Sequence, residues 1–275
     1  MPRKDAKKAD GRLSFSHVFP YKDENPTELT PLVTLGIIAL NVLAWLFLQG
    51  MGSEEALRTS VCQLGLIPGE LLRGVPPGTP IPIGQDQLGH MLYCDRVVSN
   101  APHWGAVLTS MFMHGGWFHL LGNMWFLWVF GNNIEDSMGH TRFVVFYLLC
   151  GVAAAAAQIV ADPRSGVPMV GASGAISGVM GAYILLYPRV RVHTLVFLGI
   201  FVTTVAWPAY VILGYWFVLQ LLLGAAGTLG GTQGGTAFWA HVGGFIAGLA
   251  LIKIFANPEF LERRSAGMLI LPRDA

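Results

Sequence analysis

The chain has 275 residues, of which 53% are hydrophobic and only 12% are Asp, Glu, Lys or Arg. This charged fraction is about half that of an ordinary soluble domain, so the composition argues against that class and indicates a polytopic membrane protein. The net charge of +1 provides no basic surface for nucleic acid. At roughly 20 residues per membrane-crossing helix, the length allows one bundle of about six helices and a large loop.

Residues 1–29 mix both signs of charge and lack an apolar core, so we expect a short cytosolic tail rather than a signal peptide. The membrane domain is expected at 30–256. Its first span, 30–48, should begin with Thr30 as the helix cap. Residues 51–115 are rich in Gly and Pro and too long for a simple connector, so we expect a partly helical loop along the membrane surface.

Three cysteines are present. Cys62 and Cys94 share the first loop and could form a disulfide if it faces an oxidising compartment, although their spacing alone does not show it. Cys150 lies in an apolar run, where a packed thiol is expected. His114 and His119 do not form an HExxH metal motif, so we expect no metal and no cofactor.

The remaining spans are expected at 117–133, 142–161, 171–187, 207–224 and 236–256. Glu135 and Asp136 should occupy the turn after the second span. Residues 193–206 are interpreted as a loop or interfacial segment, 224–235 as a flexible linker, and 257–275 as a second cytosolic tail.

Six spans place both termini on one side, together with most of the 17 Lys and Arg residues. The positive-inside rule makes that side cytoplasmic. We therefore expect an integral protein of a bacterial plasma membrane, with its functional site opening to the outer side and the lipid bilayer around it.

Ser173 stands at the start of the fourth span. The first amides of a helix have no internal partner, so a hydroxyl there is well placed to act as a nucleophile beside an oxyanion site. Glycines spaced three or four apart allow another helix to approach closely. The helix-packing candidates are Gly171, Gly174, Gly178, Gly244 and Gly248. The alternative interpretation is that the serine belongs only to a Gly/Ser packing stripe.

Polar groups inside lipid are costly and often mark function. His119 and Asn123 are four residues apart on the second span, and therefore on one face. His241 lies near the start of the sixth span. At 1.5 Å per residue, these side chains and Ser173 share one outer layer of the membrane. A close crossing of the fourth and sixth spans would bring hydroxyl and imidazole within hydrogen-bond reach, as a dyad without a carboxylate.

Three motifs occur in order on these spans. They are His119-x-x-x-Asn123, Gly171-x-Ser173-Gly174 and Ala240-His241-x-x-Gly244-x-x-x-Gly248. Over residues 30–256 the chain resembles the rhomboid family of intramembrane serine proteases. The resemblance implies a six-helix all-α bundle in which Ser173 is the nucleophile and His241 the base. It also implies that His119, Asn123 and the Ser173 amide hold the oxyanion, and that the substrates are transmembrane segments of other proteins.

We expect substrates to enter between the second and fifth spans. The resemblance suggests that Trp216 and Phe217 form a gate there; the alternative is that these aromatic residues belong only to the core or to an interface belt. Some family members stack the histidine on a tyrosine one turn after the serine; here that position is Ser177, so the support of the ring stays open. Two alternative functions also stay open: an inactive rhomboid-like protein that binds membrane clients, and a small transporter. The oligomeric state stays open as well.

Overall fold

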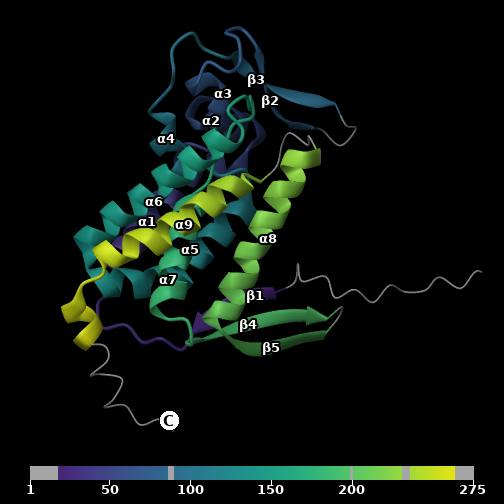
Figure 1. Cartoon of the computed structure of the whole chain (residues 1–275). Helices are drawn as coiled ribbons and strands as arrows, with labels where there is room; N and C mark the ends of the chain where they lie inside the picture. The colour runs from purple at the N-terminus through teal and green to yellow at the C-terminus, as the bar shows by residue number, and fades with distance from the viewer. Residues whose placement is uncertain (1–17, 86–89, 199–200, 231–235, 264–275) are drawn as a thin grey trace, which may run out of the picture.

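The computed structural model describes residues 18–85, 90–198, 201–230 and 236–263. Long helices form a bundle, with a small subdomain at one end and a three-stranded sheet at the other (Figure 1). The bundle helices are α1 (Leu32–Phe47), α5 (Trp117–Met138), α6 (His140–Ala161), α7 (Ser173–Leu186), α8 (Ala209–Gly230) and α9 (Phe238–Phe255). Of these, α6, α8 and α9 are long and apolar enough to cross a membrane, while α1 and α7 are shorter apolar helices. The chain is therefore an integral membrane protein.

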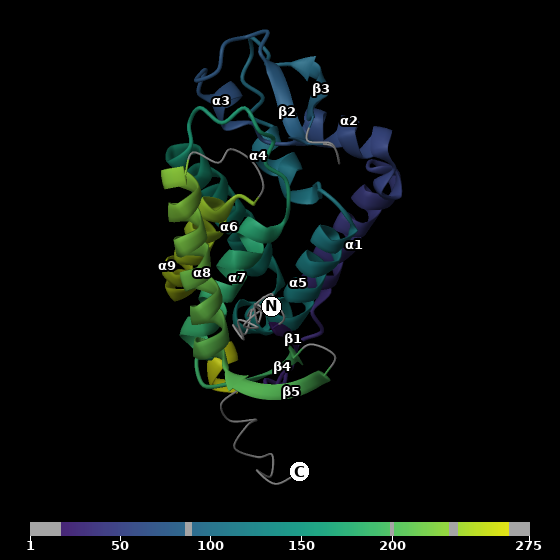
Figure 2. The same cartoon turned by 90° about the vertical axis from the view of Figure 1, so that its right-hand side faces the viewer.

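Helix α7 lies at the centre of the bundle. It packs against α5, α6, α8 and α9, and its residues from Gly174 to Tyr183 are all buried. Figure 2 shows α7 between α5 and α8. Because glycine and alanine make up much of α7, the surrounding helices can approach its backbone closely.

The start of α1 is capped by another helix. The carboxylate of Glu135 accepts hydrogen bonds from the Val33 and Thr34 amides, both at 2.8 Å, and from the Thr34 hydroxyl at 2.6 Å. The expectation that Thr30 caps this helix was wrong, because the helix begins after Pro31 and no side chain of its own caps it.

The end of the second span also differs from the prediction. Helix α5 continues beyond Asn133 to Met138, so Glu135 and Asp136 are helical and buried rather than in a turn. Asp136 accepts the amides of Glu28 and Leu29. Both carboxylates are tolerated there because backbone N–H groups of the incoming chain satisfy them.

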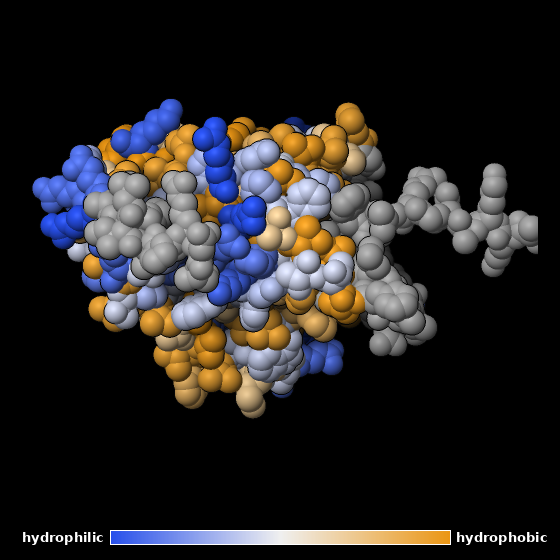
Figure 3. All heavy atoms as spheres, turned by 90° about the horizontal axis from the view of Figure 1, so that it is seen from below, coloured by the Kyte–Doolittle hydropathy of each residue, from blue (hydrophilic) through white to orange (hydrophobic). Residues whose placement is uncertain are grey.

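A sheet closes the end of the bundle that lies opposite the first loop. Strands β1 (Val18–Asp23), β4 (Arg191–Leu198) and β5 (Phe201–Pro208) pair antiparallel in the order β1-β4-β5. The segment 193–206, expected as a loop or interfacial segment, is therefore most of a hairpin. Residues 18–23, within the expected cytosolic tail at 1–29, form the third strand of the sheet. Valine, threonine and aromatic residues in both hairpin arms favour this structure. Figure 3 views this end, where hydrophilic residues gather across the middle of the face.

The expected linker at 224–235 is largely helical, because α8 continues to Gly230, and residues 231–235 lie outside the described ranges. Gly224 lies against Phe238 and Trp239 of α9, where the absence of a side chain allows the contact. The Trp239 indole also donates a hydrogen bond to the Thr228 hydroxyl at 3.0 Å. Packing against α9 thus maintains the helix through a glycine-rich segment.

The first loop folds into a subdomain. It contains α2 (Glu54–Leu64), α3 (Pro68–Leu71), β2 (Pro80–Gln85), β3 (Met91–Val97) and α4 (Ala106–Thr109). The β2–β3 hairpin was not expected from the sequence. A disulfide joins Cys62 on α2 to Cys94 on β3.

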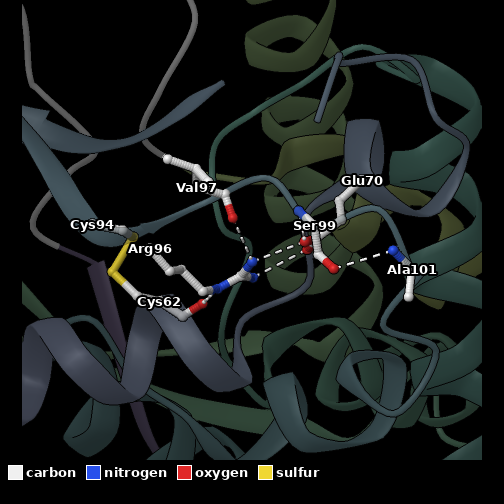
Figure 4. Close-up of polar contacts among 7 residues, drawn as sticks. All are labelled: Cys62, Glu70, Cys94, Arg96, Val97, Ser99 and Ala101. Atoms are coloured by element: carbon white, nitrogen blue, oxygen red, sulfur yellow. Dashed lines mark hydrogen bonds and ion pairs between the residues drawn. A yellow bond between two sulfur atoms is a disulfide. The ribbon is translucent and has the colours of Figure 1, made fainter. Parts of the chain in front are cut away.

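A partly buried ion pair holds the hairpin to α3. The Glu70 carboxylate, which is 3% exposed, accepts hydrogen bonds from Arg96 at 2.8 and 3.0 Å and from the Ser99 amide at 2.8 Å. Figure 4 shows the guanidinium between this carboxylate and the Cys62 carbonyl, to which it also donates at 2.7 Å. Burial by itself would raise the pKa of Glu70, but these donors lower that pKa below its usual value.

Candidate functional site

Ser173 is the first residue of α7, and His241 lies in the first turn of α9. The serine Oγ is 2.7 Å from the imidazole Nε2, which is hydrogen-bond distance. His241 is 9% exposed. A hydroxyl held against an imidazole at the start of a helix has the geometry of a nucleophile and its base.

The close crossing of α7 and α9 sets this distance. A Cβ built on Gly244 would overlap the carbonyl oxygen of Gly174, and one on Gly248 would overlap that of Gly178. The two helices therefore meet backbone to backbone at both places. Any larger residue at these positions would separate the helices that carry the serine and the histidine.

Gly171 has a different role from the helix packing expected of it. It lies before α7 and has a φ of +126°, a conformation that other residues rarely adopt. A Cβ at this position would lie 2.7 Å from His119 Nε2. The glycine thus lets the imidazole of His119 approach the loop that leads into Ser173.

His119 and Asn123 line the same cavity as Ser173 and His241, and its volume is about 810 Å³. Nδ1 of His119 accepts the Gly115 amide at 3.2 Å, which leaves Nε2 as the nitrogen that carries hydrogen. Within the described ranges, the Asn123 Nδ2 is buried and has no hydrogen-bond partner. Two side-chain donors are thus available to an anion formed in this cavity.

The imidazole of His241 is held from α8. Its Nδ1 is 2.8 Å from the Gln220 Oε1, and the Trp216 ring centroid is 5.6 Å from its own. The Ser177 hydroxyl instead donates to the Ser173 carbonyl at 2.6 Å. Sequence reasoning missed Gln220, although an uncharged polar side chain in an apolar span was a usable signal.

The two expected gate residues lie in different surroundings. Trp216 lines the cavity, while Phe217 stacks on Phe245 of α9 with ring centroids 4.5 Å apart. Phe118 of α5 also lines the cavity, which is therefore bordered by both α5 and α8.

The first-loop subdomain contributes to the cavity as well. Leu57 and Arg58 of α2, Ile83 of β2 and Leu92 of β3 are among its lining residues. The insertion that carries the disulfide therefore forms part of the wall around the site.

These features define a membrane protein in which a half-buried serine at the start of a central helix faces a buried histidine. The family model described as Rhomboid domain matches residues 101–258, which is more than half of the chain and includes all the residues of this pair and its neighbouring donors. The chain belongs to the rhomboid family.

Three curated relatives illustrate the range of the similarity. Rhomboid-like protein 11, chloroplastic, of Arabidopsis thaliana is 29% identical over 58% of this chain and 55% of its own length. Rhomboid protease GluP of Bacillus subtilis is 33% identical over 54% of this chain and 26% of its own length. The mitochondrial presenilin-associated rhomboid-like protein of Mus musculus is 36% identical over 36% of this chain and 26% of its own length. The chain thus spans about half or less of the length of these relatives.

Proposed function

We propose that this protein is a rhomboid-type intramembrane serine protease. It hydrolyses peptide bonds in or near the transmembrane segments of other membrane proteins through Ser173 and His241. The observation that carries the proposal is the 2.7 Å contact between the serine Oγ and the imidazole Nε2 at the start of α7. A protease among the relatives supports the reaction class.

The proposed reaction proceeds through an acyl-enzyme. The Nε2 of His241 takes the hydroxyl proton as Ser173 Oγ attacks the peptide carbonyl carbon. The resulting oxyanion accepts hydrogen bonds from the Ser173 amide, Asn123 Nδ2 and His119 Nε2. The imidazolium then gives its proton to the leaving amine, and water, activated by the same imidazole, hydrolyses the ester and restores the hydroxyl.

For the topology we propose six spans within residues 30–256, with both termini in the cytoplasm of a bacterium and the cavity open to the outer side. Arg189 and Arg191 adjoin the sheet end, which supports a cytoplasmic location for that end. The Cys62–Cys94 disulfide lies at the opposite end and supports an oxidising compartment there.

Mass spectrometry of the unreduced protein tests this orientation. Linked Cys62 and Cys94 peptides are expected, and two free thiols in freshly isolated membranes would contradict the orientation.

The test of the activity uses a fluorophosphonate, which labels an activated serine, together with a transmembrane substrate in lipid vesicles. Ser173→Ala and His241→Ala should each abolish both labelling and cleavage without lowering the melting temperature by more than a few degrees. Ser137→Ala, in a buried serine of α5 that bonds the Ile134 carbonyl, is the matched control and should retain both. Cleavage that survives Ser173→Ala would refute the assignment. An unsubstituted protein that binds membrane clients but is never labelled would instead favour the inactive client-binding alternative.

A further inference from the structure

The His241 ring has a second hydrogen-bond partner, Gln220, which takes no direct part in the proposed reaction of the serine–histidine dyad. We propose that Gln220 is a positioning residue for the reaction, which holds His241 in the tautomer that can accept the serine proton. This inference rests on the proposed protease function and adds a third side chain to its machinery. It also makes the reactive pair depend on the position of α8.

The two hydrogen bonds of the ring are chemically coupled. A neutral imidazole carries one hydrogen, and an amide oxygen can only accept. With the Gln220 Oε1 2.8 Å from Nδ1, that nitrogen must carry the hydrogen, which leaves the Nε2 lone pair facing the Ser173 hydroxyl at 2.7 Å. If the amide nitrogen faced the ring instead, the hydrogen would move to Nε2, and His241 could no longer serve as the base.

The site suits an amide better than a carboxylate. Gln220 is buried, at 8% exposure, in the middle of an apolar helix. A charged side chain at this depth is costly, whereas an amide oxygen accepts the same hydrogen bond without a net charge. A neutral amide that orients an imidazole also occurs in the Cys-His-Asn arrangement of papain-like proteases, on an unrelated fold.

A second contact from α8 fixes the plane of the ring. Trp216 lies one helical turn before Gln220, and therefore on the same face, with its ring against His241. Both contacts come from a helix that also borders the cavity. If α8 moves away from α9 to admit a substrate helix, it withdraws the support of the imidazole. The pair would then be competent only after α8 returns.

The experiment measures the rate of fluorophosphonate labelling at Ser173 as a function of pH, because this small probe does not require a substrate helix to enter. Gln220→Leu should slow labelling by roughly tenfold to a hundredfold, since the ring loses the acceptor that selects its tautomer. Gln220→Glu should recover part of the rate. A carboxylate beside Nδ1 favours the imidazolium, so the acidic limb of its pH profile should move to higher pH.

Thr228→Val is the matched control. It removes the other side-chain hydrogen bond described between α8 and α9, which joins Thr228 to Trp239, without touching His241. It should label at the unsubstituted rate with an unshifted pH profile. A slowing equal to that of Gln220→Leu would mean that any loosening of α8 has this effect and would overturn the specific role.

Other outcomes separate this inference from the proposed function. An unsubstituted protein that is not labelled at Ser173 would overturn both. Normal labelling with an unchanged rate and pH profile in Gln220→Leu would overturn the positioning role alone. If that variant does not fold, Gln220→Met decides, because it keeps the length of the side chain but has no amide oxygen for Nδ1: it should slow labelling as much as Gln220→Leu, and labelling at the unsubstituted rate would overturn the positioning role.

Discussion

Replacing Gly244 with alanine tests whether the helix crossing sets the reactive geometry. The added Cβ would overlap the Gly174 carbonyl oxygen, whereas ordinary contact begins at 3.4 Å. Because both partners are backbone, α7 and α9 must part by about 1 Å or more, and overpacking of this kind costs about 1–3 kcal/mol. The Ser173–His241 distance would then exceed the ~3.2 Å reach of a working hydrogen bond.

We expect Gly244→Ala to lower the melting temperature by several degrees and the fluorophosphonate labelling rate by about a hundredfold, the usual effect of a misplacement of about 1 Å. Gly214→Ala on α8 is the matched control, because no atom lies within 4 Å of the position of its added Cβ. Alanine there should leave labelling unchanged and raise helix stability by up to about 1 kcal/mol. If both variants were labelled at the same rate as the unsubstituted protein, the reactivity of Ser173 would not depend on the close crossing of α7 and α9.

The same structure makes four further predictions. Asn123→Ala should lower kcat by about 2.7–4 kcal/mol in activation free energy with little change in KM, and a lowered melting temperature at an unchanged rate would contradict this role. Arg96→Met leaves the Glu70 carboxylate buried without its cation and should cost about 3–5 kcal/mol in stability of the loop, whereas Asp95→Asn, in an exposed pair, should cost less than about 1 kcal/mol. The pKa of Glu70 is lowered in the folded protein, so the ionised carboxylate stabilises the loop at every pH above the ordinary Glu pKa of about 4.3. This stabilisation is lost as the pH falls through the folded pKa, and limited proteolysis of the loop at different pH values can measure the loss. Trp216→Ala should raise the rate of transmembrane-substrate cleavage relative to that of small-probe labelling, and an equal fall in both rates would show that this residue supports His241 and the packing of α8 but does not gate substrate entry.

Long apolar elements could be predicted from the sequence because their length and composition specify them locally. The ranges expected for the third and sixth spans agree with α6 and α9 to within about two residues, the usual uncertainty of helix ends. The spacing of His119 with Asn123, and of Gly244 with Gly248, was also informative. Residues four apart on a helix share a face wherever that helix packs.

The missed features depend on partners distant in the sequence. From the sequence, Glu135 was assigned to a turn because a buried carboxylate is unfavourable. In the structure it is buried because the amides at the start of α1 donate hydrogen bonds to it. The β4–β5 hairpin is a short apolar run between helices, for which periodicity does not distinguish strand from interfacial segment. Gln220 is an uncharged polar residue in an apolar span, which indicated a role, but its contact with His241 of α9 depends on how α8 and α9 pack.

Among the described residues, the side chain that contacts the second nitrogen of His241 is the neutral Gln220, and the surroundings of the site explain why it is not charged. Ser173, His241, Gln220 and Asn123 can all be neutral at rest, so burying them among apolar helices does not carry the cost of an isolated charge. In the proposed reaction, charge appears only when the serine proton reaches the imidazole, and the Asn123 amide and the Gln220 oxygen then face opposite ends of the new dipole. Interactions that strengthen only in the transition state are the ones that accelerate a reaction. The neutrality that favours folding within lipid therefore also favours the reaction proposed for this site.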